Sequence, residues 1–281
     1  MIINNLPGEG KNYIWFKRLN KFEKQETLRQ IQFKRKHWPD IKDGCWSKRP
    51  AYTYPHIMPV GNLKKVFYEP IANPVIEYCE DNDIAIHSEA LNLRSSQVCC
   101  FNVMFPFKLD HLLGVKCLGR LLPDAVEIED IQFEYTGPDG ITEWLGEPMG
   151  GKRGQNRTSI DAAIWWKDRN GNKNVTLVEW KYTEKSFGSC GGYESGGNKN
   201  KNWCKEFDLS LRNKENKCYL AYSNNHRKYW EHLKEAGINI DKLADIKGCP
   251  FKGPFCQLMR QYFKTARRCE QCVSCVSWLQ R

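Results

Sequence analysis

The sequence predicts an α/β fold in which a central mixed β-sheet of about four or five strands is flanked by helices. Short runs of apolar, β-branched and aromatic residues between turn signals predict the strands, and longer stretches with apolar residues at helical spacing predict the helices. The Asn-Gly pair at positions 170 and 171 predicts that two strands form a hairpin. The predicted strands cover residues 125–135, 159–166, 175–182 and 217–223. The predicted helices lie within residues 13–35, 89–101, 227–236 and 255–272.

The N-terminal segment, residues 1–85, is expected to be a basic elaboration packed on the core that residues 86–281 form. The net charge is +10, and from Lys11 to Arg49 twelve Lys and Arg stand against four Asp and Glu. Such a segment can neutralise phosphates and release counterions, which gives affinity without sequence information. Its aromatic residues could stack on bases. Their helical spacing favours a buried helix face instead.

Acidic residues lie within both strands of the predicted hairpin. Asp161 lies in the first strand and Glu179 in the second, with Lys181 two residues later. Because side chains at i and i+2 of a strand point to one face, Glu179 and Lys181 share a face, and antiparallel pairing would bring Asp161 beside them. Two converging carboxylates repel each other unless a cation compensates. Mg²⁺ or Mn²⁺, which prefer oxygen ligands, would provide that cation.

With these residues the chain resembles the PD-(D/E)xK nuclease superfamily, which includes restriction-endonuclease-like and RecB-like enzymes. Asp161 matches the first acid, although Ile160 stands where the family often has proline, and Glu179 and Lys181 match the second motif. The resemblance implies a restriction-endonuclease-like core that hydrolyses DNA with Mg²⁺ or Mn²⁺. It also implies that Asp161, Glu179 and the Trp180 carbonyl bind the metal and that Lys181 positions water. An Asp and a Glu-x-Lys triplet on a solvated strand face is the alternative.

Two further segments extend this resemblance over residues 86–266. Residues 93–102 look like the Ser-Ser-Gln…Phe-Asn helix of a poorly characterised bacterial group in the superfamily, and residues 254–261 look like its C-terminal Gln-Leu-x-Arg helix. The superfamily usually carries an outer acidic or amide residue on the helix before the first strand. Gln97, as a catalytic residue, and Glu89, as a metal ligand, are the candidates for this position. Glu134 and Glu147 compete with them.

Two segments are expected to contact the nucleic acid. The loop 150–158 precedes Asp161, and its glycines allow close backbone approach, so its cations could reach a phosphate there; a flexible polar loop is the alternative. In the C-terminal helix, positions 257, 260 and 261 fall on one face. The family's tyrosine, four residues after the glutamine, has no match, because Tyr262 follows Gln257 by five. The residues expected to bind substrate are Lys152, Arg153, Arg157, Gln257 and Arg260.

Thirteen cysteines are present, and eight of them follow Glu179. Cys269, Cys272 and Cys275 form a compact triplet to which Cys256 or Cys249 could add a fourth thiolate. The triplet resembles that of iron-sulfur nucleases, although their fourth cysteine lies upstream of the nuclease core. Three alternatives stay open: a [4Fe–4S] cluster, a structural zinc ion, or thiols that pack as small hydrophobes along a continuing helix.

The expected function is DNA cleavage in restriction, phage defence or repair, and the alternative is a catalytically silent nucleic-acid-binding subunit with a nuclease fold. RNA is a third ligand to consider. No apolar run approaches the roughly 20 residues that span a bilayer, and no secretory signal is evident, so a cytoplasmic protein is expected. The absence of a phosphate-binding GxxxxGK[ST] loop means that ATP hydrolysis would need a protein partner. A homo-oligomer is also compatible with the sequence.

Overall fold

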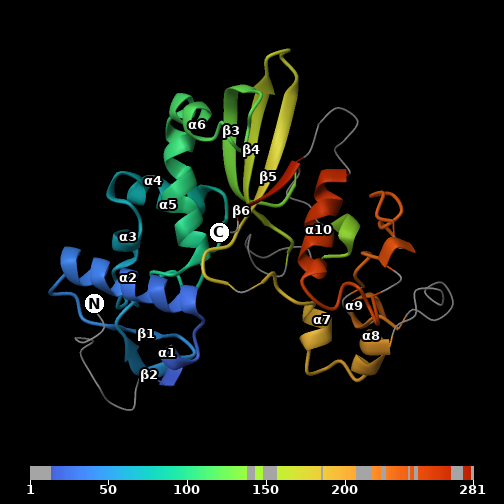
Figure 1. Cartoon of the computed structure of the whole chain (residues 1–281), viewed down its shortest axis with the longest axis horizontal. Coiled ribbons are helices and arrows are strands. Elements are labelled where there is room, and N and C mark those ends of the chain that lie inside the picture. Colours follow the sequence, from blue (N-terminus) through green and yellow to red (C-terminus); the bar gives the residue numbers. More distant parts are fainter. Residues whose placement is uncertain are drawn as a thin grey trace.

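The architecture is a sheet that stands between an N-terminal group of helices and a C-terminal lobe (Figure 1). We call residues 14–117 the N-terminal lobe and residues 186–266 the C-terminal lobe. The computed structural model describes residues 14–137, 143–147, 157–184, 186–206, 217–222, 226–239, 241–243, 246–266 and 275–279.

The central sheet has the strand order β3-β4-β5-β6. β3 (Ala125–Tyr135), β4 (Ile160–Asp168) and β5 (Lys173–Trp180) pair antiparallel, and β6 (Cys275–Leu279) adds parallel to β5. The predicted mixed sheet and its hairpin are therefore confirmed, and the hairpin turn contains Gly171 at φ +80°. β6 was not predicted, because its residues had been assigned to a cysteine-bearing helix or its end.

The N-terminal lobe begins with two helices in the basic segment, as predicted. A capping box fixes the start of the longer helix: Asn20 Oδ1 accepts from the Glu23 amide at 2.8 Å, and the Asn20 amide donates to Glu23 Oε2 at 2.7 Å. Lys34 is buried, and its ammonium donates to two backbone carbonyls and to Asp43. The elements of this part are α1 (Ile14–Lys17), α2 (Lys21–His37), β1 (Gly44–Trp46), β2 (Arg49–Tyr54), α3 (Leu63–Val66), η2 (Glu69–Ile71) and α4 (Ala72–Asp81).

The helix that covers the sheet from the N-terminal side is α5 (Ser96–Leu109), followed by α6 (His111–Cys117). α5 starts later than the predicted 89–101, because Ser95 caps its first turn and residues 88–95 form turns. Phe101 and Phe105 pack on Phe133 of β3, with ring centroids 4.7 and 5.4 Å apart. No single helix among the described residues is long and apolar enough to cross a membrane; α5 and α6, bent by 119°, reach that length and composition only together.

The C-terminal lobe contains short helices and turns around its own apolar cluster. The prediction of a strand over 217–223 is wrong, because α9 (Tyr219–Tyr222) forms there and packs Leu220 against Gly192, where a Cβ would lie 2.6 Å from Leu220 Cγ. The helix expected over 227–236 is a series of turns tied to Leu145 by the Lys228 amide. The remaining elements are η3 (Glu143–Leu145), α7 (Gly191–Glu194), α8 (Lys201–Glu206), η5 (Asp241–Leu243) and α10 (Phe255–Ala266).

Candidate active site

Three carboxylates lie in one row across the central sheet. The pairs Phe133–Ala162 and Tyr135–Ile160 flank Glu134 and Asp161, so these two acids lie across from each other on β3 and β4. The pair Ala162–Val178 is followed by Asp161 and Glu179, which lie across from each other where β4 begins and β5 ends. Neighbouring strands lie about 4.8 Å apart, so the row brings the three acids together from segments far apart in the sequence. The expectation that the hairpin brings Asp161 beside Glu179 is thus confirmed.

Glu179 forms the end of the row on the side of the C-terminal lobe, and it is buried. The Lys181 ammonium donates to its Oε1, as expected for side chains two residues apart on a strand. From α10, Gln257 Nε2 donates to the same oxygen at 2.5 Å, and Gln261 Nε2 donates to Oε2. Two amides and one ammonium therefore fix the Glu179 carboxylate.

Glu134 forms the opposite end of the row. Its Oε1 accepts from Gln97 Nε2 at 2.8 Å, and its Oε2 accepts from Ser159 Oγ at 2.6 Å. Gln97 is itself fixed, because it also donates to the Ala85 carbonyl and accepts from the His87 amide. Glu134 has φ +45°, a left-handed conformation that is uncommon outside glycine and is often found at functional sites. Gln97 thus reaches the row through Glu134.

Asp161 occupies the centre of the row. The Trp180 amide donates to its Oδ2 at 2.6 Å, and within the described residues no other hydrogen bond reaches this carboxylate. Desolvation and the negative charges of Glu179 and Glu134 raise the pKa of Asp161 well above its ordinary value, although Lys181 opposes the shift. The centre of the row therefore has an excess of negative charge.

Lys181 is a cation in direct contact with the row, through Glu179. Its ammonium lies 5.7 Å from the Phe187 ring centroid, and its side chain is 18% exposed. Burial alone would lower its pKa, but the charge of Glu179 and the hydrogen bond to it raise the pKa above the ordinary lysine value. Lys181 is therefore a protonated side chain that the hydrogen bond to Glu179 keeps beside the two carboxylates of the hairpin.

The donor set fits a hard divalent cation. The carboxylates of Asp161 and Glu179 lie beside the Trp180 backbone, and Asp161 Oδ1 accepts no hydrogen bond from the described residues. Mg²⁺ is usually bound by only one or two protein carboxylates, so this set of ligands is sufficient for it. No three His, Cys, Asp or Glu side chains in the described ranges form a closed ligand set for a metal. A metal here would therefore rely on backbone, water and substrate oxygens besides Asp161 and Glu179.

A comparison with known protein families shows the family to which the chain belongs. The family described as "Restriction Endonuclease associating with ARP" matches residues 21–276. The chain belongs to this family. No curated protein and no solved structure matches it. Membership in this restriction-endonuclease family confirms the expected kinship with restriction-endonuclease-like proteins and indicates a nuclease-like role.

Two residues of this restriction-endonuclease family member lie away from the row, contrary to expectation. Glu89 lies in the turns before α5, and its carboxylate accepts from Ser47 near the β1-β2 hairpin. Arg260 is half-buried in the C-terminal lobe, where its guanidinium contacts Tyr229 and lies near Glu147. Neither side chain makes a hydrogen bond or ion pair with the three carboxylates among the described contacts, so the roles expected for Glu89 and Arg260 stay predictions.

Glu147 organises the buried network around Arg260. Its carboxylate accepts from the Thr158 amide at 2.8 Å, from the Thr158 hydroxyl and from the Tyr229 hydroxyl at 2.9 Å. Burial and the Glu147 charge raise the pKa of Tyr229. Glu147 thus joins the segment before β4 to the C-terminal lobe and is a structural residue rather than the outer ligand.

Other expected site residues are only partly described. Lys152, Arg153, Cys269 and Cys272 lie outside the described residues, and Arg157 is described directly before β4. Cys275 belongs to β6, where it pairs with Thr176, so a helical cysteine stripe through Cys275 is wrong. Cys256 is buried in the C-terminal lobe beside Cys190.

Gln261 and Ser159, which donate hydrogen bonds to acids of the row, were not among the predicted site residues. Gln261 follows Gln257 by four residues, so both amides project from one face of α10 onto Glu179. This i, i+4 spacing is the signal in the sequence that could identify Gln261, whereas Tyr262, the residue compared with the family's tyrosine, is exposed. Ser159 had no signal of its own, because its role depends on Glu134 lying opposite β4.

The raised pKa of Asp161 predicts that its charge destabilises the metal-free protein. Because the folded pKa exceeds the unfolded one, stability is lost as pH rises from the ordinary aspartate range through the raised pKa. In EDTA near neutral pH, Asp161→Asn should therefore melt higher than the wild type, by roughly 2–4 °C for each kcal/mol of relieved repulsion.

Asp168→Asn is the matched control in the same hairpin. Hydrogen bonds from Asn172 lower the pKa of Asp168, so this change should lower the melting temperature or leave it unchanged. An Asp161→Asn protein that melts at or below the wild-type temperature would contradict the destabilising role of the Asp161 charge.

Proposed function

We propose that this protein is a Mg²⁺- or Mn²⁺-dependent nuclease that hydrolyses DNA phosphodiester bonds in restriction, phage defence or repair. The observation that carries the proposal is the pair Asp161 and Glu179, opposed across a hairpin with Lys181 on the same carboxylate, in a member of a restriction-endonuclease family. A glutamate on a solvated strand face would not be buried and would not accept hydrogen bonds from three side chains, as Glu179 does.

Each residue of the row has a separate role in the proposed reaction. Asp161, Glu179 and the Trp180 carbonyl would hold the metal, which supplies Lewis-acid activation and charge neutralisation when bound. Gln257 and Gln261 orient Glu179, and Gln97 orients Glu134, an acid that can take part from the other end of the row. Such outer hydrogen bonds fix the direction in which a carboxylate presents its lone pairs.

Lys181 provides the positive charge that the chemistry needs. Its raised pKa keeps it protonated, so it is suited to orient the attacking water and to offset charge that develops on the phosphoryl oxygens, rather than to remove a proton. Its contact with Glu179 places the ammonium at the position where water and phosphate would meet the carboxylates.

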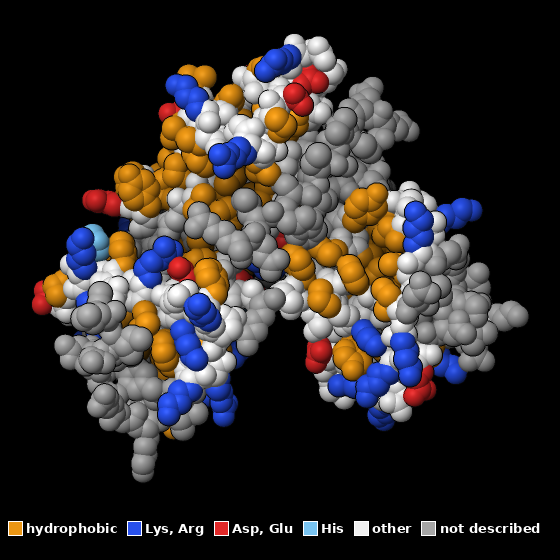
Figure 2. Space-filling model, in the orientation of Figure 1, with side chains coloured by type: hydrophobic (Ala, Val, Ile, Leu, Met, Phe, Trp, Pro, Cys, Tyr) orange, Lys and Arg blue, Asp and Glu red, His pale blue; other side chains and the backbone are white. Residues whose placement is uncertain are grey.

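The surface supports a nucleic-acid substrate. The space-filling view shows the molecule hollowed between the N-terminal lobe and the C-terminal lobe, and Lys and Arg side chains gather on both rims (Figure 2). The ends of β4 and β5 that carry Asp161 and Glu179 lie between the two lobes (Figure 1). We propose that DNA lies in this hollow, where phosphate contacts give affinity without reading bases.

A catalytically silent DNA-binding subunit is the second candidate, and one observation favours it. Both Glu179 oxygens are already occupied by Lys181, Gln257 and Gln261, so a metal would have to displace or share these donors. The family description links its restriction endonucleases to ARP, and we propose that this chain likewise acts with a partner. Cleavage by the purified chain would separate the two candidates.

Gln257 and Gln261 provide the sharpest test of how Glu179 is held. Replacing either amide with Ala should leave the fold intact and reduce cleavage, or the apparent Mg²⁺ affinity, by about 10- to 100-fold, because the carboxylate loses its orientation. The measurement is the initial cleavage rate over a Mg²⁺ titration.

The matched control is Tyr262→Ala, on the same helix but exposed. It should leave both the rate and the Mg²⁺ dependence near wild type. Equal losses for Tyr262→Ala and Gln261→Ala would show that α10 acts through general packing and not through the two amides.

A further inference from the structure

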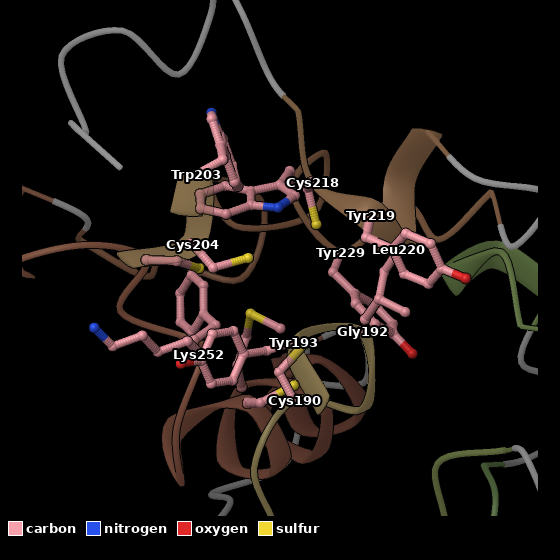
Figure 3. A pocket seen from close by; sticks show the side chains of 15 residues that line it. Cys190, Gly192, Tyr193, Trp203, Cys204, Cys218, Tyr219, Leu220, Tyr229 and Lys252 are labelled. Atoms are coloured by element: carbon pink, nitrogen blue, oxygen red, sulfur yellow. The ribbon is translucent and has the colours of Figure 1, made fainter. Parts of the chain in front are cut away.

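A second cluster of chemically reactive side chains lies in the C-terminal lobe, apart from the row of acids. One pocket is lined by cysteines and aromatic rings, and their side chains point into a common space (Figure 3). The cysteines come from five separate places in the chain: Cys190, Cys204, Cys218, Cys249 and Cys256.

Two of these cysteines are in direct contact. The Cys256 thiol hydrogen bonds to the Cys190 sulfur, which also accepts from the amides of Tyr193 and Gly192. The backbone fixes this approach, because the Cys190 amide donates to the Lys252 carbonyl at 3.1 Å, four residues before Cys256. Cys190 is partly exposed, whereas Cys256 is buried.

The surroundings of the pair favour one thiolate. The hydrogen bond from Cys256 lowers the pKa of Cys190 to about 6, against the opposing effect of burial, and the two amides and the Arg260 charge lower it further. The pKa of Cys256 is correspondingly raised. By contrast, burial raises the pKa of Cys249 to about 12 and that of Cys204 above the ordinary thiol value. Cys190 is therefore the nucleophilic thiol of the pocket.

We propose that Cys190 and Cys256 form a peroxide-sensitive thiol pair that closes to a disulfide. The geometry suits a pair better than a metal, because the described residues contain no closed set of three Cys, His, Asp or Glu ligands. Both cysteines line the same pocket, the Cys190 amide donates to a carbonyl four residues before Cys256, and the two thiols hydrogen bond to each other, so the backbone holds the pair together.

The reaction balances with hydrogen peroxide as the oxidant. The Cys190 thiolate attacks the peroxide oxygen, the O–O bond breaks, and with one proton taken up the products are a Cys190 sulfenic acid and water. The Cys256 sulfur then attacks the sulfenic sulfur and gives up its proton, the S–O bond breaks, and the hydroxide leaves as water. Each two-thiol site thus reduces one peroxide to two waters. The disulfide would tie the segment before α7 to α10.

The proposal is tested on the full-length protein with hydrogen peroxide. After stoichiometric treatment and alkylation of the remaining thiols, peptide mapping should find Cys190 linked to Cys256. In Cys256→Ser, the same treatment should leave a sulfenic acid on Cys190 that dimedone traps. Cys190→Ser should show neither product, and Cys249→Ser, from the same pocket, should retain the link.

A second readout does not depend on variants that fold well. In the wild type at slightly acidic pH, iodoacetamide should label Cys190 several-fold faster than the exposed Cys45, because the lowered pKa of Cys190 keeps a substantial share of this thiol as thiolate. Both cysteines recovered as free thiols after peroxide would overturn the proposal. Stoichiometric zinc in the purified protein, with Cys190 protected until a chelator is added, would overturn it equally.

Discussion

Lys181→Ala is expected to lose at least about 10²-fold in DNA cleavage while DNA affinity stays within a few-fold of wild type. The ammonium contacts Glu179 of the acid pair, whereas phosphate affinity is expected from many surface charges on both lobes. Single-turnover cleavage and DNA binding in Ca²⁺ would measure the two quantities separately.

Lys173→Ala is the matched control, since Lys173 lies on the same strand, is exposed, and pairs with Glu129 away from the row. It should cleave like the wild type. If Lys181→Ala also cleaves normally, the role assigned to this lysine is wrong. If it loses cleavage and DNA affinity in equal measure, Lys181 serves substrate binding instead.

Glu147→Ala is expected to cost about 3–5 kcal/mol of unfolding free energy, the range for removing one partner from a buried charged network. The change removes the buried acceptor shared by Thr158 and Tyr229, and it removes the negative charge that lies near the half-buried Arg260 guanidinium. Urea unfolding followed by fluorescence would measure the loss.

Two further variants serve as controls for the stability loss expected of Glu147→Ala. Glu147→Gln keeps the volume and one acceptor, so its loss should be smaller. Glu235→Ala removes an exposed acid that pairs with His232 in the same lobe, and it should change stability by at most about 1 kcal/mol. A Glu147→Ala protein as stable as Glu235→Ala would refute the anchoring role of Glu147.

The parts of the fold that the sequence predicted are those with strong local patterns. The hairpin followed from runs of apolar, β-branched and aromatic residues on either side of Asn170-Gly171, and the helix prediction in the basic segment followed from its apolar spacing. The strand over 217–223 and the helix over 227–236 failed. In the C-terminal lobe the local propensities are weak, and contacts such as Leu220 on Gly192 decide the outcome.

In the candidate active site, too, only the residues with a strong local pattern could be predicted from the sequence. Asp161, Glu179 and Lys181 could be found because a two-residue strand period and one turn bring them together. The roles of Glu134 and Gln261 depend on which strand lies beside β4 and on where α10 docks, and these are long-range facts that short motifs do not contain. For the same reason, the contact between Arg260 and Tyr229 could not be predicted from the spacing of residues in α10.

The central claim is that Asp161 and Glu179 form a metal-dependent phosphodiesterase centre. The most direct measurement is cleavage of linear, circular and single-stranded DNA by the purified protein in Mg²⁺, Mn²⁺ or EDTA, beside Asp161→Asn. We predict cleavage that requires the metal and is lost in the variant, while DNA binding persists. Cleavage that survives in EDTA or in Asp161→Asn would contradict the claim, and no cleavage of any substrate would favour the silent binding subunit.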